Sequence, residues 1–211
     1  MKRIAALLAG LMMMAAASAY ALPTYPALTL TSGATQILVE DGSVLDTIGA
    51  VGIVGFSGNV GDWTLSLSTG FAPSAGIPTM HLNSVNLSSG AGSLSIKFSD
   101  LLAAEWFGTG ATASVGGILA SGASATFTTL IDGQAVSTLS GAPGAFSAEE
   151  TFVYQPTGGE LIELVAEIEH LSAGVSSFDY DVAPVPEPGT MLLLGAGFLG
   201  LAIYGKRRKN A

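Results

Sequence analysis

The middle of the chain alternates apolar residues with small polar residues, and this period of two constrains the fold more than any other feature. The alternation is clearest in residues 63–68 (WTLSLS) and 94–99 (LSIKFS). Because successive side chains of a β-strand point to opposite faces of the sheet, such runs predict strands with one buried face and one solvated face. Strands of that kind are typical of antiparallel sheets.

Turn-forming residue pairs separate these runs from further short apolar runs. The pairs are Asp41-Gly42, Gly58-Asn59, Ser89-Gly90, Asp132-Gly133 and Gly158-Gly159. Many short strands joined by glycine-rich turns are typical of two packed sheets. We therefore predict an all-β fold, an antiparallel two-sheet sandwich of jelly-roll-like type. Its further strands are expected at residues 28–31, 36–40, 50–57, 80–88, 123–131, 150–155 and 175–182.

Two segments fit the strand pattern less well. Residues 99–107 (SDLLAAEWF) could open a short helix with Ser99 or Asp100 as its N-cap. Residues 160–171 (ELIELVAEIEHL) fit two patterns, because their apolar side chains recur at helical spacing and also alternate with glutamates. Both helix and strand are therefore open for this segment on periodicity alone.

The N-terminus has the three parts of a secretory signal peptide. Two basic residues precede an apolar stretch over residues 4–17, and small residues follow it. This stretch would span only about 21 Å as a helix, too little for a bilayer core, so a short membrane anchor is the less favoured interpretation. We predict a signal peptide over residues 1–21, cleaved after Ala19 or Ala21, with the secretion translocon and signal peptidase as partners.

The C-terminus combines a proline motif, an apolar span and a basic cluster. Pro186-Glu187-Pro188 precedes the uncharged stretch 189–205, which would be about 25 Å long as a helix and just long enough to cross a bilayer. We predict one C-terminal transmembrane helix there. By the positive-inside rule, the basic cluster after it should stay cytoplasmic. That cluster comprises Lys206, Arg207, Arg208 and Lys209.

This order of parts resembles the PEP-CTERM sorting signal of exported bacterial proteins, and the resemblance covers residues 185–211. It implies recognition by an exosortase, a membrane-embedded cysteine transpeptidase-like enzyme that processes its substrates near the Pro-Glu-Pro motif. An ordinary single-span anchor with a proline-rich stalk is the alternative interpretation. The residues that would carry recognition are Val185, Pro186, Glu187 and Pro188.

The resemblance also bears on the middle of the chain. Residues 52–64 and 90–96 are similar to the first half of β domains found on such sorting substrates, which have no activity to carry over. Similar exported sandwich domains have a strand where residues 160–171 lie, so a strand is favoured there. The predicted domains are a signal peptide (1–21), an all-β exported domain (22–183) and a sorting signal (184–211).

The exported part is strongly acidic and lacks cysteine. Of the seven basic residues only Lys97 lies between residues 22 and 187, where all 16 acids lie, so this segment has a net charge of −15. Such a surface repels nucleic acid, and no nucleic-acid partner is expected. Without cysteine there can be no disulfide framework and no thiolate nucleophile.

No catalytic residues are predicted. Only His81 and His170 could act as imidazole bases, and each is expected to be exposed or capped. No motif of a serine hydrolase or a zinc protease occurs. Four aromatic residues could stack on sugars if they were exposed, although aromatic side chains at alternating strand positions usually belong to the core. These residues are Trp63, Trp106, Tyr154 and Tyr180.

Several carboxylates are close in sequence. On a strand, residues at i and i+2 share a face about 7 Å apart, as Asp179 and Asp181 would. A solvated acidic face is the expected role for such pairs. A calcium ion is the alternative, with Asp179 and Asp181 as its candidate ligands, and no other cofactor is expected. The remaining pairs are Glu149/Glu150, Glu163/Glu167 and Glu167/Glu169.

Together these features predict a non-catalytic exported protein that an exosortase sorts to the cell surface or extracellular matrix. It would be held in the membrane by its C-terminal helix before processing. The resemblance implies association with exopolysaccharide in a biofilm. A secreted carbohydrate-active enzyme, a carbohydrate-binding module and a permanently anchored surface protein are the alternatives.

Overall fold

A computed structural model describes residues 25–71, 79–102, 110–154, 158–185 and 193–199, together with residues 201 and 206, but not the side chains of residues 67–69 and 71. Several predicted features lie outside these residues. They are the signal peptide with Ala19 and Ala21, the motif Pro186-Glu187-Pro188, the basic residues Arg207, Arg208 and Lys209, and Trp106.

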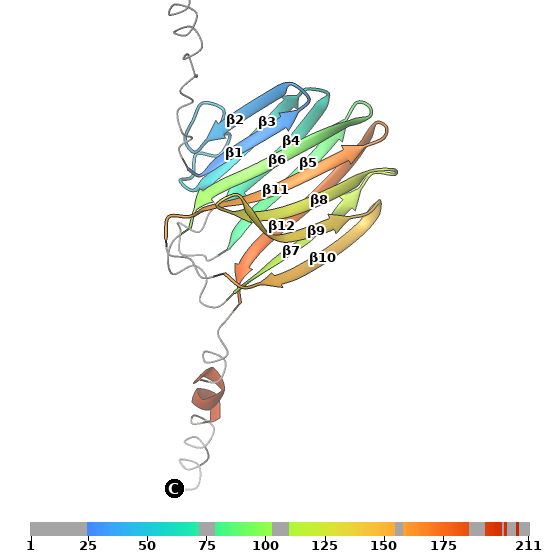
Figure 1. Cartoon of the computed structure of the whole chain (residues 1–211). Coiled ribbons are helices and arrows are strands. Elements are labelled where there is room, and N and C mark those ends of the chain that lie inside the picture. The colour runs from blue at the N-terminus through green and yellow to red at the C-terminus, as the bar shows by residue number, and fades with distance from the viewer. Residues whose placement is uncertain are drawn as a thin grey trace, which may run out of the picture.

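The described strands form two six-stranded antiparallel sheets that pack face to face (Figure 1). The first sheet has the order β2 (Thr35–Glu40), β1 (Ala27–Ser32), β6 (Gly92–Leu101), β11 (Leu161–His170), β8 (Ser124–Ile131) and β9 (Gln134–Gly141). The second sheet has the order β10 (Gly144–Phe152), β7 (Ala111–Leu119), β12 (Gly174–Pro184), β5 (Met80–Ser88), β4 (Trp63–Phe71) and β3 (Ile53–Val60). The predicted all-β, antiparallel two-sheet sandwich is therefore confirmed.

Most connections cross from one sheet to the other, and only β1–β2, β3–β4, β4–β5 and β8–β9 are hairpins within a sheet. As a result β12, the last strand, lies in the interior of the second sheet between β7 and β5. The jelly-roll-like type of the sandwich stays a prediction.

The core lies between the sheets and is formed by alternate side chains of every central strand. Phe127 of β8 joins the two layers, because its ring centroid lies 5.1 Å from that of Phe178 and 5.6 Å from that of Tyr180, both on β12. Each such fully buried large side chain contributes about 1.5–3 kcal/mol to folding. The largest fully buried side chains are Trp63, Tyr180, Phe98 and Phe127.

The ambiguous acidic segment is a strand. Residues 161–170 form β11, which pairs with β6 on one side and β8 on the other, so the favoured interpretation is confirmed. The alternative helix beginning at Ser99 or Asp100 is wrong, since both residues belong to β6. The ladder between β6 and β11 continues to the pair Leu101–Leu161, which keeps this backbone extended.

Some boundaries differ from the predicted ones. β3 runs over residues 53–60 instead of 50–57, and Gly58-Asn59 lies inside it, at a β-bulge, instead of forming a turn. The turn to β4 comes later, where Gly61 has a positive φ of 57°. β10 begins well before the predicted residue 150, and β7 and β9 were not predicted from the sequence.

At the C-terminal end of the sandwich, pairing continues to the last described residue before the proline motif. The backbone N–H of Val185 donates a hydrogen bond of 3.0 Å to the carbonyl oxygen of Gly110. Further on, residues 193–199 are helical. Among the described residues, no helix combines the length and the apolar character needed to cross a bilayer.

Candidate functional site

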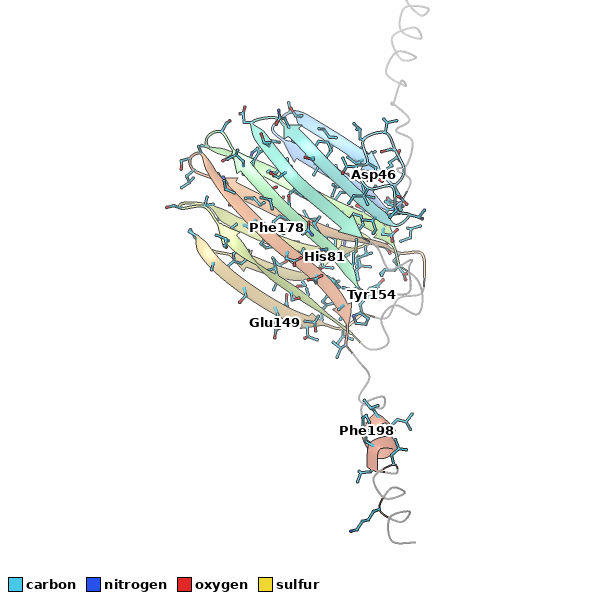
Figure 2. The ribbon with its side chains drawn as sticks, turned by 180° about the vertical axis from the view of Figure 1, so that it is seen from behind. Asp46, His81, Glu149, Tyr154, Phe178 and Phe198 are labelled. Carbon is cyan, nitrogen blue, oxygen red and sulfur yellow. The ribbon has the colours of Figure 1, made fainter. Side chains whose placement is uncertain are left out.

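The candidate site lies on the outer face of the second sheet, where β5 and β12 are neighbours (Figure 2). Met80 and Leu82 are buried, so the alternation of β5 turns His81 and Asn83 outward. The register places Asp181 directly opposite His81 and Asp179 directly opposite Asn83. Four polar side chains thus meet on two adjacent strands.

The imidazole of His81 lies between two carboxylates. Its Nδ1 atom is 2.6 Å from Oδ1 of Asp181, and its Nε2 atom is 3.1 Å from Oδ1 of Asp179. The side-chain amide nitrogen of Asn83 lies 3.0 Å from the same Nε2 atom. The ring is largely buried, with 14% of its side chain exposed, whereas 63% of the Asp179 side chain is exposed.

The charges of this cluster perturb one another. Burial would lower the pKa of His81, but the hydrogen bond and the charge of Asp181, together with the charge of Asp179, raise it above its usual value. Burial raises the pKa of Asp179, an effect that His81 opposes and Asp181 reinforces. The cluster therefore holds a proton on the imidazole more readily than an isolated histidine would.

The neighbouring strand β7 leaves space beside the cluster. Ser114 lies opposite Asp181 and Gly116 lies opposite Asp179. A hollow of about 210 Å³ lies over these four residues. A Cβ atom built on Gly116 would come no closer than 3.8 Å to another atom, so the glycine leaves the side of Asp179 open to solvent.

The cluster contains the two aspartates that were predicted as candidate metal ligands. They share one face, as expected of residues at i and i+2 on a strand. His81 and Asn83 were not predicted with them. Within the described part of the chain, His81, Asp179 and Asp181 are the group of histidine and acidic side chains close enough to share a metal ion.

His170 lies in a different environment. Only 1% of the residue is exposed, so the expectation of an exposed histidine is wrong. Its Nδ1 atom lies 2.6 Å from Oγ of Ser88, its Nε2 atom lies 2.7 Å from Oγ of Ser176, and its ring packs against Trp63 with centroids 4.5 Å apart. Burial lowers the pKa of His170.

Glu163 and Glu150, from two of the other carboxylate pairs, bind partners within the sandwich. Glu163 is buried and bonded to Lys97. Oε2 of Glu150 accepts hydrogen bonds from the Ser137 hydroxyl and the Thr138 backbone N–H, which ties β10 to β9 where the two sheets meet at one edge. Both acids thus have structural partners.

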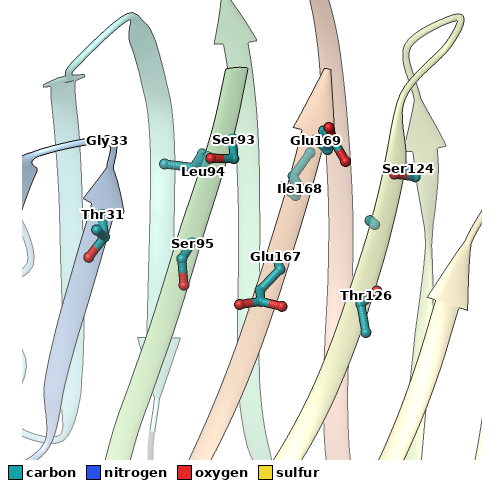
Figure 3. Close-up of a pocket in the computed structure, with 11 residues that line it drawn as sticks. Thr31, Gly33, Ser93, Leu94, Ser95, Ser124, Thr126, Glu167, Ile168 and Glu169 are labelled. Atoms are coloured by element: carbon teal, nitrogen blue, oxygen red, sulfur yellow. The ribbon is translucent and has the colours of Figure 1, made fainter. Parts of the chain in front are cut away.

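Glu167 and Glu169 line a hollow of about 460 Å³ on the outer face of the first sheet (Figure 3). Their neighbours across the strands carry hydroxyl groups, since Glu167 lies opposite Ser95 and Thr126, and Glu169 lies opposite Ser93 and Ser124. The hollow is therefore rich in hydrogen-bonding groups.

Of the four aromatic residues considered above, the three that the structure describes do not form a sugar-stacking platform. Trp63 and Tyr180 are almost completely buried, and the Tyr180 hydroxyl lies 2.6 Å from that of Thr129 inside the core. Tyr154 is partly exposed near the end of β10. In the described part of the chain, these three side chains are thus not exposed together on one face.

Comparison with known proteins identifies the C-terminal segment. Residues 184–209 match the PEP-CTERM protein-sorting motif. The match begins at the last residue of β12 and includes Val185 and Lys206 among the described residues. No curated protein sequence matches the chain.

The solved structures that this chain resembles are distant from it. TmCBM61, solved in complex with beta-1,4-galactotriose, is 8% identical over 61% of this chain and 81% of that one, with a TM-score of 0.34. The family 11 carbohydrate-binding module from Clostridium thermocellum is 11% identical over 78% and 99% of the two chains, with a TM-score of 0.34. The enzymatically active domain of bacteriophage CBA120 tailspike protein 4 is 15% identical over 66% of this chain and 21% of that one, with a TM-score of 0.35.

Proposed function

We propose that this chain is a non-catalytic exported protein that an exosortase sorts to the cell surface or extracellular matrix. The observation that carries the proposal is the position of the PEP-CTERM motif, which begins at residue 184, where the sandwich ends. The backbone bond from Val185 to Gly110 places the last pairing of the folded domain directly before the processing motif. The sandwich is then the part that is exported, and the segment after it is the sorting signal.

The steps before sorting follow from the two ends of the chain. The signal peptide over residues 1–21 directs the chain to the secretion translocon and is removed by signal peptidase. The apolar residues 189–205 then hold the protein in the membrane, with the basic cluster at 206–209 on the cytoplasmic side. Exosortase processing near residues 186–188 releases the sandwich from this anchor.

The acidic exported domain is suited to a hydrated matrix. A net charge of −15 between residues 22 and 187 keeps such a domain soluble and repels other polyanions. We propose that it associates with exopolysaccharide in a biofilm. Neither histidine supports a catalytic role, because His170 is buried between two serines and His81 lies on an open sheet face between carboxylates.

The test is the intact mass of the protein recovered from its own host in the medium, matrix and membrane fractions. A mature form that ends near residue 188, in the medium or the matrix, is expected. Changing Pro186, Glu187 and Pro188 together to alanine should leave a membrane-bound form that runs to Ala211. Normal processing of that triple variant would contradict the proposal.

A matched control separates loss of the motif from a general effect of three alanine substitutions. Val44, Val51 and Val153 are highly exposed on the sandwich. Their combined change to alanine should leave the position of the new C-terminus, as deduced from the mass, unchanged. The distribution of the protein between the fractions should also stay the same. If the wild type and every variant run from about Leu22 to Ala211, the protein is instead a permanently anchored surface protein.

Carbohydrate binding is a second candidate function, and the hollow on the first sheet favours it. Carboxylates and hydroxyls side by side are the groups that hydrogen-bond sugar hydroxyls. If this hollow binds polysaccharide, changing Glu167 and Glu169 to glutamine should reduce retention on the host exopolysaccharide, and changing Glu149 to glutamine on the other sheet should not. Release of reducing ends by the wild-type protein would instead indicate a carbohydrate-active enzyme.

A further inference from the structure

The cluster on β5 and β12 has the arrangement of a metal-binding histidine with its supporting carboxylate. We propose that His81 and Asp179 bind a divalent transition-metal ion, with zinc the best match, that Asn83 completes the protein ligands, and that Asp181 positions the imidazole. This proposal is independent of the sorting function, because it concerns only the folded sandwich.

The two ring nitrogens of His81 have different partners, and this difference assigns their roles. The 2.6 Å contact from Nδ1 to Asp181 is a short, charge-assisted hydrogen bond in which Nδ1 is the donor. It leaves Nε2 without a proton in the neutral ring, so this nitrogen can bind a metal ion. Metal-binding histidines commonly donate their other ring N–H to a carboxylate in this way.

The spacing of the two proposed ligand atoms fits one coordination sphere. Zinc binds imidazole nitrogen and carboxylate oxygen at about 2.0–2.1 Å, so two such ligands lie about 2.9 Å apart at a right angle and about 3.3 Å apart at the tetrahedral angle. Nε2 of His81 and Oδ1 of Asp179 are 3.1 Å apart. An ion can therefore bind both atoms with little movement of the strands.

Asn83 and the solvent provide the remaining ligands. The amide nitrogen of Asn83 lies 3.0 Å from Nε2, and turning the amide by half a rotation places its oxygen there instead. An amide oxygen is a metal ligand, whereas the amide nitrogen is not. On the other side of Asp179, the hollow beside Gly116 admits water to the ion.

The donor set favours zinc over the calcium that the two aspartates alone suggested. Calcium takes six to eight oxygen ligands, and one imidazole nitrogen with two or three oxygens is far from that set. Imidazole together with carboxylate suits zinc and its neighbours in the transition series. Lys97, the sole basic residue between residues 22 and 187, is bonded to Glu163 on the other sheet and does not compete for these carboxylates.

The test is calorimetric titration of the full-length, tag-free protein in detergent with zinc chloride. One saturable site is expected. His81→Gln and Asp179→Asn should each weaken zinc binding by about 100-fold or more, since each removes a ligand. Asp181→Asn should weaken it by about 10-fold, the effect typical of losing a residue that orients a ligand.

Two controls make the result decisive. Asp62→Asn changes an exposed acid in the turn between β3 and β4 and should leave zinc affinity unchanged. Because Asp179 is 63% exposed, Asp179→Asn should unfold at the wild-type temperature when zinc is removed with a chelator. The proposal is wrong if zinc does not bind, if it binds His81→Gln and Asp179→Asn as tightly as the wild type, or if calcium competes with it at equal concentration.

Discussion

The ammonium nitrogen of Lys97 on β6 lies 2.6 Å from Oε1 of Glu163 on β11. Glu163 is 7% exposed, and the Ser99 hydroxyl also donates to the same oxygen at 3.4 Å. The two strands are the central pair of the first sheet. The sole lysine between residues 22 and 187 is thus paired with a carboxylate that the fold has largely removed from water.

Changing Lys97 to methionine should destabilise the sandwich by about 1–3 kcal/mol, because it leaves a buried carboxylate without its cation. The lower part of this range is expected, since 38% of the lysine side chain is exposed. Urea unfolding at neutral pH measures the loss. The double variant Lys97→Met with Glu163→Gln should recover part of it, and a single variant as stable as the wild type would rule out this role.

His170 should make the protein less stable in mild acid. Its folded pKa is lowered by burial, so the unfolded chain takes up a proton at a higher pH than the folded chain does. The stabilising contribution is complete above the unfolded pKa of about 6.5 and is lost as the pH falls below it. Urea unfolding at a series of pH values between 5 and 8 measures this effect.

Protonation of His81 changes the stability with pH in the opposite direction to protonation of His170. The effect of His170 must therefore be measured by comparing the wild type with a variant that lacks this histidine. The folded pKa of His81 is raised, and its contribution is present below about pH 6.5 and is lost as the pH rises through the folded pKa. In His170→Gln the fall in stability toward pH 5 should become shallower than in the wild type. An unchanged slope would mean that His170 does not gain a proton on unfolding.

Two adjacent glycines on β7 should respond differently to alanine. A Cβ atom on Gly117 would lie 2.2 Å from the carbonyl oxygen of Ser177 and 2.9 Å from Cα of Phe178, both backbone atoms of β12. Gly117→Ala should therefore cost about 1–3 kcal/mol, toward the upper end because the partner atoms belong to the backbone. A Cβ atom on Gly116 would come no closer than 3.8 Å to another atom, so Gly116→Ala is the matched control, with an expected change below about 1 kcal/mol. Equal thermal unfolding temperatures would contradict this difference.

The turn between β8 and β9 depends on one glycine. Asp132 and Gly133 have positive φ angles of 48° and 74°, the geometry of a two-residue hairpin turn. Gly133→Ala should cost about 1–2 kcal/mol, because a side chain strains this conformation. Asp132→Asn should cost less, since its side-chain oxygen can still accept the hydrogen bond from the Leu161 N–H. Thermal unfolding of both variants measures the difference, and an unaffected Gly133→Ala would contradict it.

The sequence predicts the strands that alternate strongly and misses those that do not. β4 and β6 carry large apolar side chains at nearly every second position, and their pattern is visible without a structure. The pattern of β11 also fits a helix, so periodicity alone does not decide it. β7 reads ATASVGGIL, and its small residues give almost no contrast between the two faces. At Gly117 a small residue is required, because a Cβ atom there would lie 2.2 Å from the Ser177 carbonyl oxygen on β12, and no local pattern reveals this contact.

The candidate site, too, could be predicted from the sequence only in part. Asp179 and Asp181 could be paired from sequence because both lie on one strand, whereas His81 is 100 residues away from Asp181 and meets it only through the register of β5 with β12. The burial of His170 did have a signal. It follows Ala166 and Ile168 in the inward alternation of β11, which points its side chain into the core.

The pairing of β12 on both sides, up to the bond between Val185 and Gly110, has a mechanical consequence. A protein held by the residues beyond Val185 transmits any pull along the length of this strand. The hydrogen bonds to β5 and β7 run across that direction, so a tensile force loads them in shear and they must fail together. An edge strand pulled in the same direction would be held by one ladder of hydrogen bonds, whereas β12 is held by two.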